Sequence, residues 1–200
     1  MSFKRQKLAR DAATAAGLVT RVLRLRVKDK HAPWASERAR AVNTAWNFDN
    51  EVSQRILHRE GRFATAADLH VLTRGAGKEG LPIHSQTLQA VNEEFVARRA
   101  QFKRAKLRWR VSDAKSSRYS LGWVPFKKSA IAYRNGQVFL FGQPLCLWDS
   151  YGLADYELGA GSLSEDARGR WYLNVTVKVK KKPKAADPAA LGVALGIDLG

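Results

Sequence analysis

The sequence predicts an α+β fold in which a block of helices is inserted into a small antiparallel β-barrel. Three observations predict this fold. One segment with strand-like alternation stands near the start of the chain, a long region of helical spacing follows it, and several short strand-like segments punctuated by glycine come last. A single early strand cannot form a sheet alone, so we expect it to pair with the later strands. Two independent domains are the alternative arrangement.

The early strand is predicted over residues 19–28, where apolar side chains recur at nearly every second position. Pro33 interrupts this pattern. Ser36 then opens a helix of about six turns, which carries Trp46 at an apolar position and ends near Gly61. We expect this helix to be the first of the helical block.

Two more helices are predicted before the chain turns to β-structure. Thr65 followed by Asp68 resembles a capping box and begins a short helix that ends before the turn at residues 75–80. Ser85 can cap a third helix, whose apolar stripe runs through Phe95. The helical block therefore contains one long helix and two shorter ones.

The third helix is predicted to continue as a basic stripe. Seven Lys or Arg residues lie between positions 98 and 110 with no acidic residue among them, and four of them recur every three or four residues, as on one helical face. Surface helices usually pair such cations with anions, so we predict contact with nucleic acid rather than a solvated face. The interleaved tryptophan is a candidate for stacking on a base or a sugar. The predicted set is Arg98, Arg99, Lys103, Arg104, Lys106, Arg108, Trp109 and Arg110.

Short strands are predicted after the basic stripe, at residues 131–134, 137–141 and 171–178. The dipeptide Asn135-Gly136 between the first two is a strong signal for a β-hairpin, because both residues tolerate positive φ angles. These strands, together with the early one, would form the barrel.

The last twenty residues contain two different patterns. Residues 180–188 hold two prolines and several lysines, so they are interpreted as a basic linker that contacts phosphate through Lys180, Lys181 and Lys182. Residues 191–199 form an almost continuous apolar run, which is typical of a strand covered on both faces.

Charge points to a polyanionic partner. Thirty-five Lys and Arg against eighteen Asp and Glu give a net charge of +17, while a hydrophobic content of 45% is that of a folded protein. So large a surplus destabilises an isolated compact state by self-repulsion, and its binding to a polyanion is steeply salt-dependent. The basic N-terminus, which includes Lys4 and Arg5, is interpreted as an arm that binds nucleic acid, with a transit peptide as the alternative.

The remaining composition limits the compartment. Cys146 is the single cysteine and forms neither an intramolecular disulfide nor a zinc site by itself, which fits a reducing, cytoplasmic location. The sequence lacks both a run of about eighteen apolar residues and the apolar core of a secretory signal, so we expect no membrane partner. The oligomeric state does not follow from the sequence.

Several segments, taken in order, resemble the TnpB family of insertion-sequence proteins and the related compact type V CRISPR effectors. The match spans nearly the whole chain, and the ordered set is more specific than any one segment. The segments that carry it are Arg40-Ala41-Val42-Asn43-Thr44-Ala45-Trp46-Asn47, Gly80-Leu81-Pro82-Ile83-His84-Ser85-Gln86-Thr87-Leu88-Gln89 with residues 95–102, Gly122-Trp123-Val124-Pro125-Phe126-Lys127, Gly169-Arg170-Trp171-Tyr172 and Gly196-Ile197-Asp198-Leu199-Gly200.

This resemblance implies an RNA-guided DNA nuclease. A small antiparallel wedge β-barrel would be interrupted by an inserted helical recognition lobe and followed by the first strand of an RNase H-like (RuvC) domain. Its partners would be a guide RNA, the guide-target heteroduplex and the target DNA duplex with its adjacent motif, with Lys127 and Lys128 among the contacts. The implied divisions are residues 1–32 for the first part of the wedge with the basic arm, 33–111 for the recognition lobe, 112–179 for the second part of the wedge, 180–188 for the linker and 189–200 for the start of the RuvC domain.

The resemblance also implies that Asp198 is catalytic and a ligand of Mg²⁺, together with a Glu and a second Asp from later segments of the family. Because one carboxylate provides too few oxygen ligands, we expect that these 200 residues alone do not cleave DNA. A similar Gly-Ile-Asp-Leu-Gly strand occurs in actin-like ATPases, but near their amino terminus. The alternatives are a nuclease-dead, RNA-guided DNA-binding protein that acts as a repressor, and a nucleic-acid-binding protein that uses no guide.

Overall fold

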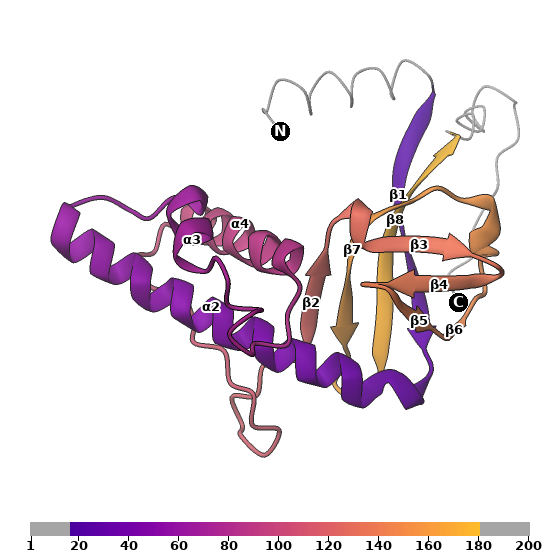
Figure 1. The fold of residues 1–200 in the computed structure, drawn as a ribbon, viewed down its shortest axis with the longest axis horizontal. Helices are drawn as coiled ribbons and strands as arrows, with labels where there is room; N and C mark the ends of the chain where they lie inside the picture. The colour runs from indigo at the N-terminus through magenta and orange to yellow at the C-terminus, as the bar shows by residue number, and fades with distance from the viewer. Residues whose placement is uncertain (1–16, 181–200) are drawn as a thin grey trace, which may run out of the picture. The chain divides into compact units, whose positions relative to one another are not determined.

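The computed structural model describes residues 17–180 and has the predicted α+β composition (Figure 1). Residues 21–177 form one compact unit. Within residues 17–180 the order is one strand, three α-helices and then a series of strands. The helices are thus inserted between strands of one sheet, as the sequence predicts.

The described residues form two antiparallel sheets. The first has the order β2-β7-β8-β1-β6, and the second has the order β3-β4-β5. The first sheet is built from β1 (Leu18–Val27), β2 (Trp123–Phe126), β6 (Leu147–Trp148), β7 (Leu158–Glu165) and β8 (Trp171–Lys180). In the sheet, β1 therefore lies between β8 and the short edge strand β6. Both of these neighbours are far from β1 in the sequence.

The second sheet consists of β3 (Ile131–Arg134), β4 (Gln137–Leu140) and β5 (Gln143–Leu145). Asn135 and Gly136 join the first two strands, with φ angles of 50° and 75°, which confirms the predicted hairpin. Three short strands linked by tight turns form this sheet without a long connection.

The predicted closed barrel is not what the described residues form. The edge strands of the larger sheet, β2 and β6, are not paired with each other. β6 has only two residues, and β2 packs against the helices α2 and α4. A strand this short offers too few hydrogen-bonding groups to close the sheet, so the structure has two sheets in place of one barrel.

The long helix α2 (Ala32–Glu60) begins four residues before the predicted Ser36 and ends where Gly61 adopts a left-handed φ of 65°. Pro33 lies in its first turn, where the missing N–H has no helical acceptor to lose. Proline therefore begins this helix instead of separating it from the strand.

The two shorter helices are α3 (Ala66–Leu72) and α4 (Ser85–Phe102). The predicted capping box at the start of α3 is confirmed, because Thr65 and Asp68 exchange hydrogen bonds of 3.2 and 2.8 Å. The cap of α4 is His84 and not Ser85, since the His84 imidazole Nδ1 accepts a hydrogen bond of 3.3 Å from the Gln86 N–H in the first turn of the helix.

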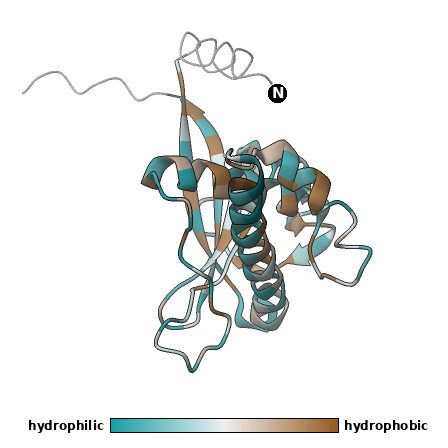
Figure 2. Ribbon diagram, turned by 90° about the vertical axis from the view of Figure 1, so that its left-hand side faces the viewer, coloured by the Kyte–Doolittle hydropathy of each residue, from teal (hydrophilic) through white to brown (hydrophobic). Residues whose placement is uncertain are grey.

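Buried hydrophobic side chains lie among the helices and in the larger sheet. Among the helices, Trp46 and Phe95 meet edge to face with ring centroids 5.4 Å apart, and both are buried. In the larger sheet, buried and partly exposed residues alternate along β8 from Trp171 onward. Figure 2 shows hydrophobic and hydrophilic residues interspersed along the strands. A Cβ on Gly161 of β7 would lie 2.0 Å from the carbonyl oxygen of Asn174, so only glycine fits this close strand approach.

A carboxyl group is buried between α2 and α4. Asp49 has no solvent exposure and no ion-pair partner among the described residues. When the amide nitrogen of Asn92 faces it, that nitrogen donates to Asp49 Oδ2 at 3.0 Å and to the Leu88 carbonyl at 2.9 Å. Burial disfavours the charged form and raises the pKa of Asp49 to about 8.

We expect this group to make folding pH-dependent. Because the pKa of Asp49 is raised in the folded state, its contribution is fully present at acid pH and is lost as pH rises towards about 8. Relative to the Asp49→Asn variant, the free energy of unfolding should fall by about 1.4 kcal/mol between pH 6 and pH 7. Urea unfolding of both proteins at each pH measures this difference, and parallel stability curves would contradict it.

Candidate nucleic-acid interface

The predicted helical stripe of cations is not helical beyond its first residues. Helix α4 ends at Phe102, and Lys103 adopts a left-handed φ of 50°. Residues 104–110 lie outside any helix and run alongside α2. The prediction that four cations share one helical face is therefore wrong.

Asparagine side chains of α2 hold this segment in place. The amide of Asn50 donates to the Leu107 carbonyl at 2.8 Å and accepts from the Leu107 N–H at 3.1 Å. Asn47 makes the same pair of bonds to Arg110, both at 2.8 Å, and the Trp46 indole donates to the Arg108 carbonyl at 3.3 Å. Side chains thus satisfy backbone groups that a helix or sheet would otherwise pair.

The chain then turns back and returns beside the same segment. The Ser120 N–H donates to the Val111 carbonyl at 2.9 Å, which closes the loop between them. Glu165 anchors the returning leg, because its carboxylate accepts from the Tyr119 hydroxyl at 2.7 Å and from the Gly122 N–H at 2.8 Å. Desolvation and this carboxylate raise the pKa of Tyr119 to about 12.

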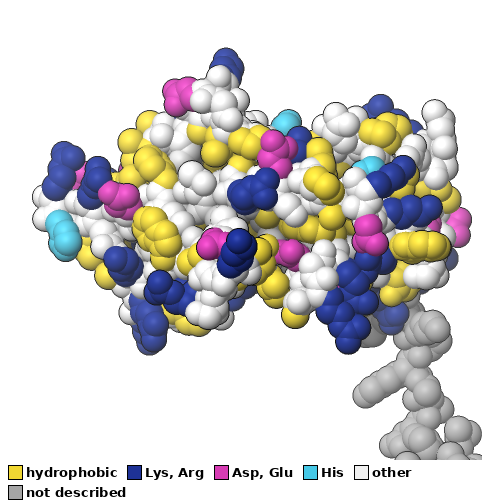
Figure 3. All heavy atoms as spheres, turned by 90° about the horizontal axis from the view of Figure 1, so that it is seen from below, with side chains coloured by type: hydrophobic (Ala, Val, Ile, Leu, Met, Phe, Trp, Pro, Cys, Tyr) yellow, Lys and Arg dark blue, Asp and Glu magenta, His cyan; other side chains and the backbone are white. Residues whose placement is uncertain are grey.

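Six cations of this loop are exposed and have neither an ion pair nor a side-chain hydrogen bond to the part of the chain that the structure describes. Residues 103–121 contain one acidic residue, Asp113, whose carboxylate accepts from a backbone N–H. In Figure 1 the loop projects below α2, and Figure 3 shows cationic side chains among hydrophobic ones from that side. We call the segment that carries these cations the basic loop. Its six cations are Lys103, Arg104, Lys106, Arg108, Lys115 and Arg118.

Arg99 belongs to the interior and not to this surface. Its guanidinium donates to the Ser53 hydroxyl and to the Ala64 carbonyl, the latter at 2.6 Å, and lies 4.7 Å from the centroid of the Phe63 ring. Burial lowers its pKa. The prediction that Arg99 contacts nucleic acid is therefore corrected, since the side chain links α4 to α2 and to the start of α3.

Arg110 is also engaged within the fold. Its Nε donates to Asn43 Oδ1 at 2.7 Å, and its guanidinium lies 5.5 Å from both the Trp46 and the Trp123 rings. Burial lowers the pKa of Arg110. Arg98 remains near the surface but pairs with Glu94 at 2.6 Å.

The other predicted contacts have mixed surroundings. Lys127 pairs with Glu93 at 3.0 Å, and Lys128 pairs with Glu157. Trp109 is 48% exposed and stays a candidate for stacking. Lys180 is exposed at the end of the described range, whereas the predictions for Lys4, Arg5, Lys181, Lys182 and Asp198 concern residues outside it.

A groove of about 670 Å³ opens between the two legs of the loop and the end of α4. Its apolar wall includes Phe102, Leu107 and Leu121, and its cationic residues include Arg104 and Arg108. None of the described residues that line it is acidic. Such a surface favours a ligand that combines negative charge with a flat apolar part.

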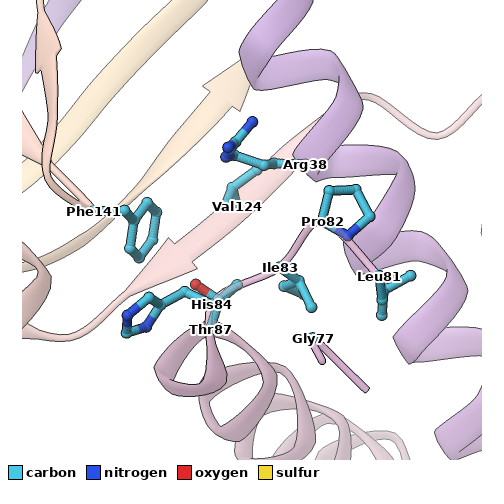
Figure 4. A pocket seen from close by; sticks show the side chains of 9 residues that line it. All are labelled: Arg38, Gly77, Leu81, Pro82, Ile83, His84, Thr87, Val124 and Phe141. Carbon is cyan, nitrogen blue, oxygen red and sulfur yellow. The ribbon is translucent and has the colours of Figure 1, made fainter. Parts of the chain in front are cut away.

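A smaller cavity of about 290 Å³ lies between α2, the start of α4 and β2 (Figure 4). Arg38 lines it from one side and Thr87 from another, with Phe141 and Val124 as apolar walls. The Thr87 hydroxyl is buried and has no hydrogen-bond partner in residues 17–180. Sequence patterns do not reveal this cavity, because its residues come from four separate segments with no common motif.

Within the described range, no group of three or more His, Cys, Asp or Glu side chains is placed to hold a metal ion. None of the helices in residues 17–180 has the length and apolar character needed to cross a membrane.

The sequence matches no family model, and no curated protein matches it significantly. The fold is similar to a chain in the cryo-EM structure of a Cas12f1-sgRNA-target DNA complex, with 14% identity and a TM-score of 0.40. The match covers 86% of this chain and 50% of that one. The chain thus spans about half the length of the chain it matches.

Proposed function

We propose that this chain is the nucleic-acid-binding region of an RNA-guided DNA nuclease of the TnpB or compact type V kind. The observation that carries the proposal is the basic loop, whose six exposed cations have no acidic partner in the described residues. Unpaired cations that lie close together repel one another, and this repulsion destabilises the folded protein. A bound phosphate backbone neutralises the cations and removes the repulsion. The net charge of +17 over the whole sequence supports the same interpretation.

The ordered sequence resemblance supports the finer part of the proposal, namely that base pairing with a guide RNA selects the DNA target. In that arrangement the protein holds backbones, a task suited to exposed Lys and Arg side chains on a rigid support. Asp198 would be one of several carboxylates that hold Mg²⁺ in the nuclease, where the metal would activate water for phosphodiester hydrolysis.

The test is to identify the nucleic acid that the protein carries when it is purified at low salt. We expect one structured RNA species in stoichiometric amount, because guided binding requires a defined scaffold. A protein that carries no nucleic acid would contradict the proposal. A mixture of unrelated RNA and DNA fragments would favour binding without a guide.

A further inference from the structure

We propose that the groove beside the basic loop holds one unpaired nucleotide of the bound RNA, with the base against Phe102 and the phosphate at Arg104 and Arg108. This inference rests on the proposed function, since it assumes that the chain binds RNA. It adds a recognition site for single-stranded RNA to a surface otherwise suited to any phosphate backbone.

Two arginines of the groove are available to bind a phosphate. Of the four arginines that line the groove, Arg110 donates to Asn43 and Arg98 pairs with Glu94. Arg104 and Arg108 are exposed and have no ion pair or side-chain hydrogen bond to the described residues. A guanidinium presents several donors in one plane, which suits the oxygens of a phosphate.

An exposed apolar wall lines the same groove as these cations. Phe102, the last residue of α4, is 56% exposed, and Leu121 on the returning leg is 44% exposed. Both line the same groove. An uncovered ring next to unpaired guanidinium groups matches a ligand that has a flat apolar face and an adjacent anion, as a nucleotide does.

The groove does not suit a nucleic-acid duplex. In the interior of a double helix both faces of each base are covered by neighbouring bases, so an internal base must unstack before it can lie against a side chain in a groove. The volume of about 670 Å³ is within the range of roughly 300–1,000 Å³ found for sites of small ligands. The groove therefore suits a single nucleotide better than a helical segment.

Hydrogen bonds from α2 fix the backbone that carries Arg108. Asn50 and Asn47 hold the backbone at Leu107 and Arg110, on either side of Arg108, with four hydrogen bonds. A fixed backbone limits the entropy that would be lost when the Arg108 side chain meets a ligand. The groove is thus positioned before the RNA arrives.

The experiment compares two probes, a fluorescent single-stranded oligoadenylate RNA and a blunt RNA duplex of the same length. The Phe102→Ala variant should bind the single strand between about 5-fold and 100-fold more weakly, because a stacking contact is lost. Its affinity for the duplex should be unchanged. The control is Tyr151→Ala, which removes an aromatic side chain of similar exposure, 47%, away from the groove and should alter neither affinity.

Salt dependence separates the two parts of the site. Phe102→Ala should leave the slope of log K against log salt unchanged, whereas Arg104→Gln should reduce it by about 0.7 for the single strand.

If Phe102→Ala weakens the binding of both probes equally, or of neither, the groove does not hold a base, although RNA binding stands. If the unmodified protein binds neither probe, the proposed function and this inference fail together. Because Phe102 is exposed, each variant should unfold at a temperature close to that of the unmodified protein, which thermal unfolding measures.

Discussion

Replacing Lys103, Arg104, Lys106 and Arg108 by glutamine should weaken the binding of RNA by about 100-fold to about 1,000-fold at 0.1 M salt. Each of these side chains is exposed and lacks an ion pair with the described residues, so it is free to displace a counterion from phosphate. Fluorescence anisotropy with a structured RNA measures the loss. The fold should persist, because the substitutions remove no interaction that the structure shows for these side chains.

The matched control changes the same number of charges elsewhere. Arg59, Arg74, Lys78 and Arg134 are also exposed and lack ion pairs in residues 17–180, but they lie outside the basic loop. A control variant with four glutamines at these positions has the same net charge and should lose far less affinity. Equal losses in the two variants would mean that total charge, and not the basic loop, determines binding.

The Asn50→Ala variant is expected to lose about 2–4 kcal/mol of stability, the largest effect on folding that we predict. Asn50 is fully buried and makes two hydrogen bonds to the backbone of Leu107, which is itself buried. Alanine leaves a donor and an acceptor without partners away from water, and this penalty exceeds the value of the bonds themselves. Urea unfolding gives the free energy.

Hydrogen exchange locates the effect of this change. The Leu107 amide should be protected in the unmodified protein and should exchange rapidly in Asn50→Ala, since its acceptor is the Asn50 side chain. The Thr44→Ala variant, on an exposed position of the same helix, is the control and should unfold near the unmodified protein. A Leu107 amide that stays protected in Asn50→Ala would mean that other contacts hold the segment.

Local sequence signals predicted most of the elements. The alternation in β1, the capping box of α3 and the Asn135-Gly136 turn each depend on residues close together in the chain, and the structure confirms all three. The start of α2 was predicted too late, because a proline in a first helical turn was interpreted as a break. These signals work where a structure is determined locally.

The candidate site could not be predicted in the same way. Its cations recur at helical spacing, yet the segment is held by asparagines that lie about sixty residues earlier, with separations of 57 and 63 residues. Asn43, Asn47 and Asn50 follow one face of α2, a pattern that in retrospect signals a face that binds another backbone. Arg99 was misassigned because a cation next to other cations was expected on the surface, whereas its partners come from distant segments.

The barrel was over-predicted for a related reason. Strand-like patterns identify which residues form strands but not how a sheet closes, since closure depends on strand length and on what covers each edge. Here α2 and α4 pack against the edge strand β2, an interaction between segments far apart in sequence. The α+β class was therefore predictable, and the arrangement in two sheets was not.

The most direct test of nucleic-acid binding through the basic loop is a salt titration of RNA affinity. For the unmodified protein we predict a steep linear fall of log K with log salt, because phosphate contacts release counterions. For the variant with glutamine at Lys103, Arg104, Lys106 and Arg108, the slope should be smaller by about 3 for a single-stranded RNA. Identical slopes for the two proteins would contradict the account.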